Sequence, residues 1–189
     1  MSLLVPFDNY KWPMRNPDHK PYSHQKETTI FVLSNKRCFI LNDLGTGKTL
    51  SALWACDFLL LNSKIKRILI SSPLSTLGSV WSNEIFFNFP HRKRVIAHGQ
   101  RSDRIAAIKS NAEFVIINHD GLVTMEDELL RAKFDVLIID EVTAFKNIKT
   151  DRWKAAKHIA DKCKAVWAMT AEPTPNSPVE AYGPAKIVN

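Results

Sequence analysis

Asn42-Asp43-Leu44-Gly45-Thr46-Gly47-Lys48-Thr49 is the stretch that decides the fold of this chain of 189 residues. It follows a short apolar run, residues 37–41, and opens a segment with apolar residues at helical spacing, residues 49–61. Gly45 and Gly47 can adopt backbone angles closed to other residues, so successive N–H groups can converge on phosphate oxygens at a helix N-terminus. Strand, glycine loop and helix in this order predict a phosphate-binding loop.

Side chains around Gly47 sharpen that prediction. Lys48 is placed to reach the β- and γ-phosphates of a nucleotide, and the Thr49 hydroxyl is placed to bind Mg²⁺. The general pattern G-x-x-x-x-G-K-[ST] has glycine where this sequence has Asn42, a residue type that tolerates left-handed backbone angles better than most. A strand-to-helix turn that merely needs glycines is the alternative interpretation.

An acidic pair argues against that alternative. Residues 134–139 form an apolar run that ends in Asp140 and Glu141, so both carboxylates are expected at the C-terminal edge of a buried strand. Ligands of open α/β sheets bind at this edge. Asp140 is suited to holding Mg²⁺, and Glu141 to orienting and deprotonating the water that attacks a γ-phosphate.

The rest of the chain alternates short apolar runs with amphipathic stretches, which predicts a three-layer α/β domain with a mainly parallel sheet. A helix is expected to follow Ser75 as its N-cap, with an apolar stripe that includes Leu77, Trp81 and Ile85. The cluster 91–94 (HRKR) indicates a solvated loop, with phosphate contact as the alternative. The expected strands are residues 37–41, 67–71, 93–97, 113–118, 134–140 and 164–170.

Composition bounds the partners and the compartment. Lys and Arg number 26 against 19 Asp and Glu, a formal charge of +7 that favours phosphate-rich partners. The three cysteines form no metal-ligand pattern, which indicates free thiols in a reducing compartment. No apolar run approaches the ~20 residues that cross a bilayer. We therefore expect a cytoplasmic protein with no membrane partner.

Residues 140–147 (DEVTAFKN) resemble the Asp-Glu-x-His-x-x-Lys-Asn motif of Swi/Snf-type ATPases in helicase superfamily II. Further blocks follow in the family's order. Residues 43–49 resemble its Asp-x-x-Gly-x-Gly-Lys-Thr motif, residues 72–77 its Pro-Leu-Ser motif, and residues 21–25 its glutamine motif. Trp81 and Glu84 match its Trp-x-x-Glu, and residues 113–120 resemble its strand and loop that touch the tracked strand.

The resemblance implies a RecA-like P-loop NTPase domain that hydrolyses ATP with Mg²⁺ and is stimulated by nucleic acid, DNA in preference to RNA. It also implies a role for each matching residue. These are ATP binding by Gln25 (at the adenine), Gly45, Thr46, Gly47, Lys48 and Thr49; Mg²⁺ binding by Thr49 and Asp140; catalysis by Lys48, Asp140 and Glu141; and nucleic-acid contact by Pro73, Ser75, Asn118 and His119.

Under the resemblance, the chain divides into an irregular N-terminal arm (1–22), an ATP-binding RecA-like domain (23–177) and the start of a connection to a second RecA-like domain (178–189). That second domain supplies the family's arginine finger, which accelerates phosphoryl transfer by orders of magnitude. We therefore expect this chain alone to bind nucleotide and to hydrolyse it poorly.

Three positions depart from the family pattern. Thr143 stands where the family has His, and Ala171 and Glu172 stand where it has Gly and Thr. The last two positions belong to a motif that couples hydrolysis to movement. One alternative is therefore a nucleotide-gated DNA-binding scaffold without motor activity, and another is the motor subunit of a restriction or repair complex.

Overall fold

The computed structural model describes residues 9–174 and 177–189. Within them six strands form one sheet in the order β1-β6-β5-β2-β4-β3, and every neighbouring pair is parallel. Each coincides with a run expected from the sequence to within two residues. The strands are β1 (Arg37–Ile40), β2 (Ile68–Ser72), β3 (Arg94–Ile96), β4 (Phe114–Asn118), β5 (Val136–Asp140) and β6 (Ala165–Met169).

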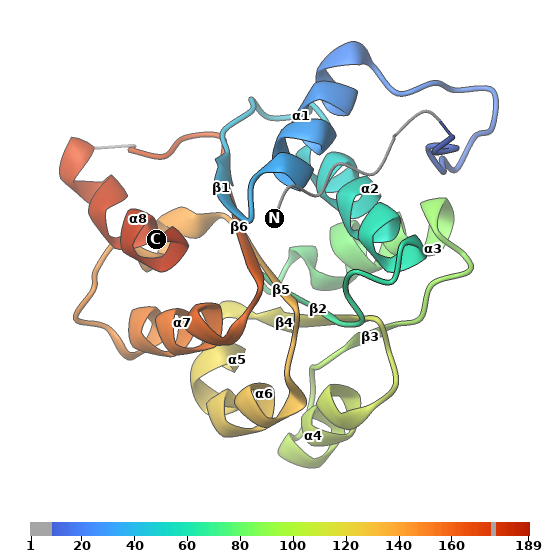
Figure 1. The fold of residues 1–189 in the computed structure, drawn as a ribbon. Coiled ribbons are helices and arrows are strands. Elements are labelled where there is room, and N and C mark those ends of the chain that lie inside the picture. The colour runs from blue at the N-terminus through green and yellow to red at the C-terminus, as the bar shows by residue number, and fades with distance from the viewer. Residues whose placement is uncertain (1–8, 175–176) are drawn as a thin grey trace.

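Helices cover both faces of the sheet, because parallel strands need crossover connections. Alternate residues of one strand enter opposite cores, as Ile68 and Leu69 of β2 do. Figure 1 shows the resulting three layers. One face carries α1 (Ser23–Ser34), α2 (Lys48–Leu61), η1 (Leu77–Ser82) and α3 (Asn83–Asn88). The other carries α4 (Arg101–Lys109), α5 (His119–Thr124), α6 (Glu126–Ala132), α7 (Asp151–Lys162) and α8 (Tyr182–Val188). Short helices η2 (Val142–Phe145) and η3 (Pro178–Ala181) precede α7 and α8.

Helix α2 is the most enclosed helix of the first face. Every residue from Ser51 to Leu59 is buried, which agrees with its apolar residues lying on all sides instead of on one stripe. The helix begins directly after Gly47. The phosphate loop predicted from the sequence is therefore anchored to an element that is buried along most of its length.

The helix expected after Ser75 begins differently from the prediction. Ser75 is exposed and does not cap it. Instead the backbone N–H and the hydroxyl of Thr76 both donate to the carbonyl of Pro73, each at 3.0 Å, and this turn delays the helix to Leu77. The first six residues, η1, form a π-helix. The predicted apolar stripe is confirmed, since Leu77, Trp81 and Ile85 are all buried.

Residues 9–22 contain neither helix nor strand. Their aromatic rings pack on α2: Tyr10 meets Phe58 edge to face with ring centres 5.5 Å apart, and Trp12 meets Trp54 at 5.3 Å. Phe7, another aromatic of the predicted arm, lies outside the described residues. The last residues, 178–189, also pack on the domain, because Ile187 and Val188 of α8 are buried in the second core.

The basic cluster 91–94 is only in part the solvated loop expected from the sequence, because His91 and Lys93 are exposed whereas Arg92 is not. The Arg92 side chain is only 10% exposed and donates to Asp57 on α2 at 2.7 Å, and to Glu113, just before β4, at 2.8 Å. The Asp57 side chain is fully buried and also accepts from the Tyr10 hydroxyl at 2.8 Å. A charge buried this deeply needs such partners. Arg92 therefore ties α2 to the residue before β4, and Asp57 ties α2 to the arm.

Candidate nucleotide site

The loop between β1 and α2 has the backbone form that the sequence predicts. Gly45 has φ +76° and Gly47 has φ +81°, values that favour glycine. Asn42, at the position where the general motif has glycine, does not adopt a positive φ. The loop therefore makes its bend at Gly45 and Gly47, with no glycine at position 42.

Lys48 points back across this loop. Its Nζ donates to the carbonyls of Asn42 at 2.7 Å and Asp43 at 2.9 Å. These contacts hold the ammonium group over the concave side of the loop, at the N-terminal end of α2, where backbone N–H groups and the helix dipole also favour an anion.

Asp140 ends β5 and Glu141 follows it directly, at the same edge of the sheet. One oxygen of Asp140, Oδ2, accepts a hydrogen bond of 2.9 Å from the indole Nε1 of Trp81. Burial raises the pKa of Asp140 above its ordinary value, and the Trp81 hydrogen bond opposes that shift. Glu141 has φ +51°, an uncommon value for a residue with a side chain, and its Oε2 accepts from the hydroxyl of Thr170 at 3.3 Å.

One cavity of about 450 Å³ connects the loop with the acidic pair. Its volume is in the range of small-molecule sites. The predicted residues on its wall are Gly45, Gly47, Lys48, Thr49, Asp140 and Glu141. The remaining wall consists of Leu44, Leu50, Thr76, Val80 and Glu84. A cation, a hydroxyl and two carboxylates from separate parts of the chain thus face one space.

Gln25 lies behind the loop and is buried. Its amide nitrogen donates to the carbonyl of Thr46 at 3.2 Å, and its amide oxygen accepts from the backbone N–H of Tyr22 at 3.1 Å. In this arrangement Gln25 braces the phosphate loop. Its contact with an adenine ring stays a prediction.

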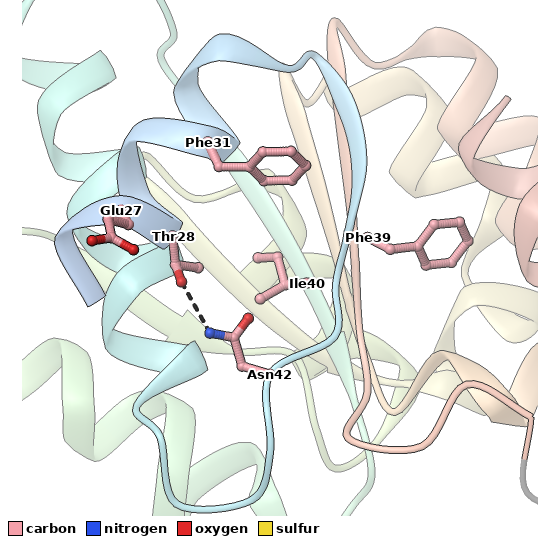
Figure 2. A pocket seen from close by; sticks show the side chains of 6 residues that line it. All are labelled: Glu27, Thr28, Phe31, Phe39, Ile40 and Asn42. Carbon is pink, nitrogen blue, oxygen red and sulfur yellow. Dashed lines mark hydrogen bonds between the residues drawn. The ribbon is translucent and has the colours of Figure 1, made fainter. Parts of the chain in front are cut away.

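Helix α1 holds the start of the loop as well. The Asn42 amide donates to the hydroxyl of Thr28 at 3.0 Å, and Figure 2 shows these two side chains pointing toward one another. They line a hollow of about 240 Å³ between α1 and β1 that is separate from the acidic pair, together with Glu27, Phe31, Phe39 and Ile40. The amide of Asn42 therefore links the loop to α1 through a hydrogen bond that glycine at this position could not form.

The predicted nucleic-acid residues lie at the ends of two neighbouring strands. Ser72 pairs with Asn118 between β2 and β4, so Pro73 and Asn118 lie at the same edge of the sheet, at the ends of neighbouring strands. Ser75 is exposed and Pro73 and Asn118 are partly so. His119 differs, because its side chain is buried and its Nδ1 lies 2.8 Å from the Ser71 hydroxyl. The imidazole is therefore turned away from any ligand on this edge.

The segment 170–172, which contains the departures Ala171 and Glu172 from the family pattern, also has a defined place in the structure. Thr170 is buried, and its hydroxyl accepts from the backbone N–H of Glu172 at 3.2 Å. Glu172 itself is exposed. Its carboxylate therefore lies outside the core at the sheet edge, while Thr170 links this segment to Glu141.

Trp81 is the site residue whose contact sequence reasoning missed. The spacing indicates a core side chain, and it is fully buried, but its one polar atom binds Asp140. The match of Trp81 and Glu84 to a family motif was the available signal, and it carried no role for either residue.

Among the described residues no three His, Cys, Asp or Glu side chains gather as a metal site. Cys38, Cys56 and Cys163 are all buried and free. Nor does any helix in the described part of the chain have the length and apolar character to cross a membrane. A divalent ion would thus depend on a few side chains of the cavity together with groups of a bound ligand.

Comparison with known families gives one extended match. A model of the SNF2-related domain matches residues 18–187. The SWI/SNF-related matrix-associated actin-dependent regulator of chromatin subfamily A-like protein 1 of Xenopus laevis is 30% identical over 84% of this chain, which spans 16% of that protein. The uncharacterized ATP-dependent helicase YqhH of Bacillus subtilis is 25% identical over 96% of this chain, which spans 32% of it.

Solved structures agree in fold. The Sulfolobus solfataricus SWI2/SNF2 ATPase core in complex with dsDNA superimposes with a TM-score of 0.80 at 22% identity, covering 94% of this chain and 37% of that one. The same core domain alone gives a TM-score of 0.73 at 23% identity. The predicted three-layer RecA-like fold is thereby confirmed. The chain spans about a third of the length of these structures, and it spans a smaller share of some relatives, down to 16%.

Proposed function

The chain belongs to the SNF2-related domain family, and on that premise we propose that it is the ATP-binding half of a DNA-dependent ATPase that moves on or remodels DNA. The observation that carries the proposal is the cavity of about 450 Å³ in which Lys48 and Thr49 face Asp140 and Glu141. Phosphoryl transfer needs positioning and neutralisation of charge more than covalent chemistry, and these four side chains supply both.

The residues of the cavity fit a magnesium nucleotide. Gly45 and Gly47 turn their backbone toward the space, and the Lys48 ammonium is already held beside it by two carbonyls. In the proposal Lys48 and the loop N–H groups hold the phosphates, while Thr49 and Asp140 hold Mg²⁺, which would neutralise phosphate charge. Gln25 is proposed to contact the adenine from its place behind Thr46.

Glu141 is the proposed residue that orients and deprotonates the attacking water. It borders the same cavity as Lys48, and its backbone is fixed at φ +51° by the turn from β5 into η2. A carboxylate held in this way acts as a general base when water lies within hydrogen-bond reach. Thr170 would keep its side chain in place through the 3.3 Å contact.

DNA is the proposed polymer, and the sheet edge beyond β2 and β4 is its proposed contact. Pro73, Ser75 and Asn118 lie there with accessible surface. Backbone N–H groups and hydroxyls of this kind commonly bind phosphates without reading sequence. His119 is proposed to support the edge from inside, since its side chain is buried.

A second RecA-like domain is proposed to complete the site. The chain spans only 16% to 37% of the relatives and structures described above, and Leu44, on the wall of the cavity, is 79% exposed. Such a domain would cover this surface and supply a cation to the phosphates. Isolated, the chain is expected to bind nucleotide and to turn it over slowly.

Titration with a fluorescent ATP analogue tests the proposal. The wild-type chain should bind it with Mg²⁺, and Lys48→Ala should abolish binding, whereas Lys109→Ala, at the far end of α4, should bind as the wild type does. Absence of binding by the wild type would refute the nucleotide role.

The DNA contact is tested by adding a short duplex labelled at one end. Ser75→Glu should weaken DNA binding by placing a negative charge against phosphates. Ser34→Glu adds the same charge at the exposed end of α1 and should change nothing. Equal effects of the two variants would place DNA elsewhere.

A further inference from the structure

Trp81 occupies a place that packing alone does not explain. It is fully buried, and its indole N–H is aimed at Asp140 Oδ2, 2.9 Å away. The other indoles whose hydrogen bonds are defined donate to backbone carbonyls, Trp54 to Pro13 and Trp153 to Gly183. The indole N–H of Trp167 has no partner among the described residues. Of these four, Trp81 alone binds a carboxylate.

The helix that carries Trp81 is itself unusual. Residues Leu77–Ser82 form a π-helix that continues directly into the α-helix α3. Inserted π turns are rare and concentrate at functional sites, because they shift the side chains that follow them around the helix axis. Here η1 delivers a core side chain to Asp140 and places Val80 on the wall of the cavity, which also includes Thr76 just before η1 and Glu84 in α3.

We propose that Trp81 is a positioning residue that fixes the orientation of the Asp140 carboxylate for Mg²⁺. The inference rests on the proposed function and adds to it a residue that touches neither nucleotide nor metal. A carboxylate at the end of a strand can rotate about its Cβ–Cγ bond. The bond from Trp81 restrains Oδ2 and so limits the directions in which the group can present its other oxygen to a cation.

Partners of this kind tune metal sites strongly. Removing a hydrogen-bond partner of a metal ligand typically weakens metal binding by about 10-fold to 100-fold. Trp81 should therefore affect the part of nucleotide affinity that depends on Mg²⁺, and it should leave the part supplied by the phosphate loop unchanged.

The experiment measures binding of the fluorescent ATP analogue twice, with Mg²⁺ and with EDTA, for the wild type and for Trp81→Phe. The gain in affinity due to Mg²⁺ should fall about 10-fold in Trp81→Phe, while affinity in EDTA stays the same. Trp167→Phe is the matched control, because it removes a buried indole whose N–H has no partner, and it should keep the full gain. An equal gain in both variants would overturn the proposal.

A second pair of variants separates orientation from packing. Replacing Trp81 with β-(3-benzothienyl)alanine keeps the shape of the ring and removes only the N–H, so it should lose the Mg²⁺ gain although the core is intact. In an Asp140→Ala background Trp81→Phe should cost nothing further, as expected for residues that act through one another. Additive losses would overturn the proposal. Failure of the proposed function looks different, because the wild type would then bind no nucleotide at all.

Discussion

The side-chain amide of Gln25 occupies the space that a Cβ atom on residue 47 would need. Gly47 therefore meets two requirements at once: a backbone φ of +81° and the absence of a side chain beside α1. Gly45 meets only the first, since nothing lies within 4 Å of the position of its missing Cβ. Both glycines are needed for their backbone angle, and Gly47 is needed also because it leaves room for Gln25.

We therefore predict that Gly47→Ala weakens nucleotide binding more than Gly45→Ala does. Left-handed angles cost an L-residue roughly 1–2 kcal/mol, which corresponds to about a tenfold loss of the competent loop. Gly47→Ala should add displacement of Gln25. The fluorescent-analogue titration measures both, with Gly78→Ala as control, because that glycine has no positive φ and its nearest neighbour would be 3.9 Å away. Equal losses at positions 45 and 47 would show that Gln25 does not restrain the loop.

Burial of His119 predicts a dependence of stability on pH. Burial, reinforced by Arg152 and opposed by Asp120, lowers the pKa of His119 from 6.5 to about 4. The unfolded chain then binds a proton as the pH falls below 6.5, whereas the folded chain binds it only near pH 4. The stability that comes from neutral His119 is therefore present above pH 6.5 and is lost as the pH falls from 6.5 to about 4.

Between pH 7.5 and pH 5 this single group should lower the free energy of unfolding by ~2 kcal/mol. Urea denaturation at the two pH values measures the loss, and His119→Gln should reduce it by about that amount. His98→Gln, at an exposed position, provides the comparison and should leave the loss unchanged. A loss that survives in His119→Gln would assign it to other groups.

Asp57 and Arg92 give a third prediction, on stability. Arg92→Met leaves the fully buried Asp57 carboxylate without its guanidinium partner at 2.7 Å, and breaking a buried pair from one side costs about 3–5 kcal/mol. Arg131→Met removes the exposed partner of Asp127 and should cost less than about 1 kcal/mol. His91 Nε2 also lies 3.1 Å from Asp57 Oδ1. Thermal or urea unfolding compares the two variants, and similar small costs would mean that Tyr10 and His91 alone satisfy Asp57.

These same residues show which features of the fold and the site can be predicted from the sequence and which cannot. The strands, the mainly parallel sheet and the loop before α2 follow from apolar runs, their alternation with amphipathic stretches and glycine spacing, whereas the order of the strands in the sheet was not predicted. Contacts such as Arg92 with Asp57 join positions 35 residues apart. The sequence of the cluster 91–94 indicates only basic character, and it does not show that Arg92 lies between Asp57 and Glu113. The burial of His119 and the bond from Trp81 to Asp140 depend on the same long-range packing. The φ of Glu141 could not be foreseen either, because no glycine marks it.

That backbone angle gives the last prediction. Glu141 and Lys133 both lie in the left-handed region, at φ +51° and +53°. Replacing either by glycine removes steric strain, a gain partly offset by the greater freedom of glycine in the unfolded chain, so each variant should be more stable by about 0.5–1 kcal/mol. Urea denaturation should give equal gains for Lys133→Gly and Glu141→Gly.

Strain retained at a functional residue is a common compromise between stability and activity. Single-turnover hydrolysis of ATP should therefore fall to background in Glu141→Gly and stay at the wild-type rate in Lys133→Gly. Glu141→Gln keeps the backbone angle and should lose hydrolysis without any gain in stability. Hydrolysis that persists in both Glu141 variants would remove this carboxylate from the reaction and leave its strain without a functional reason.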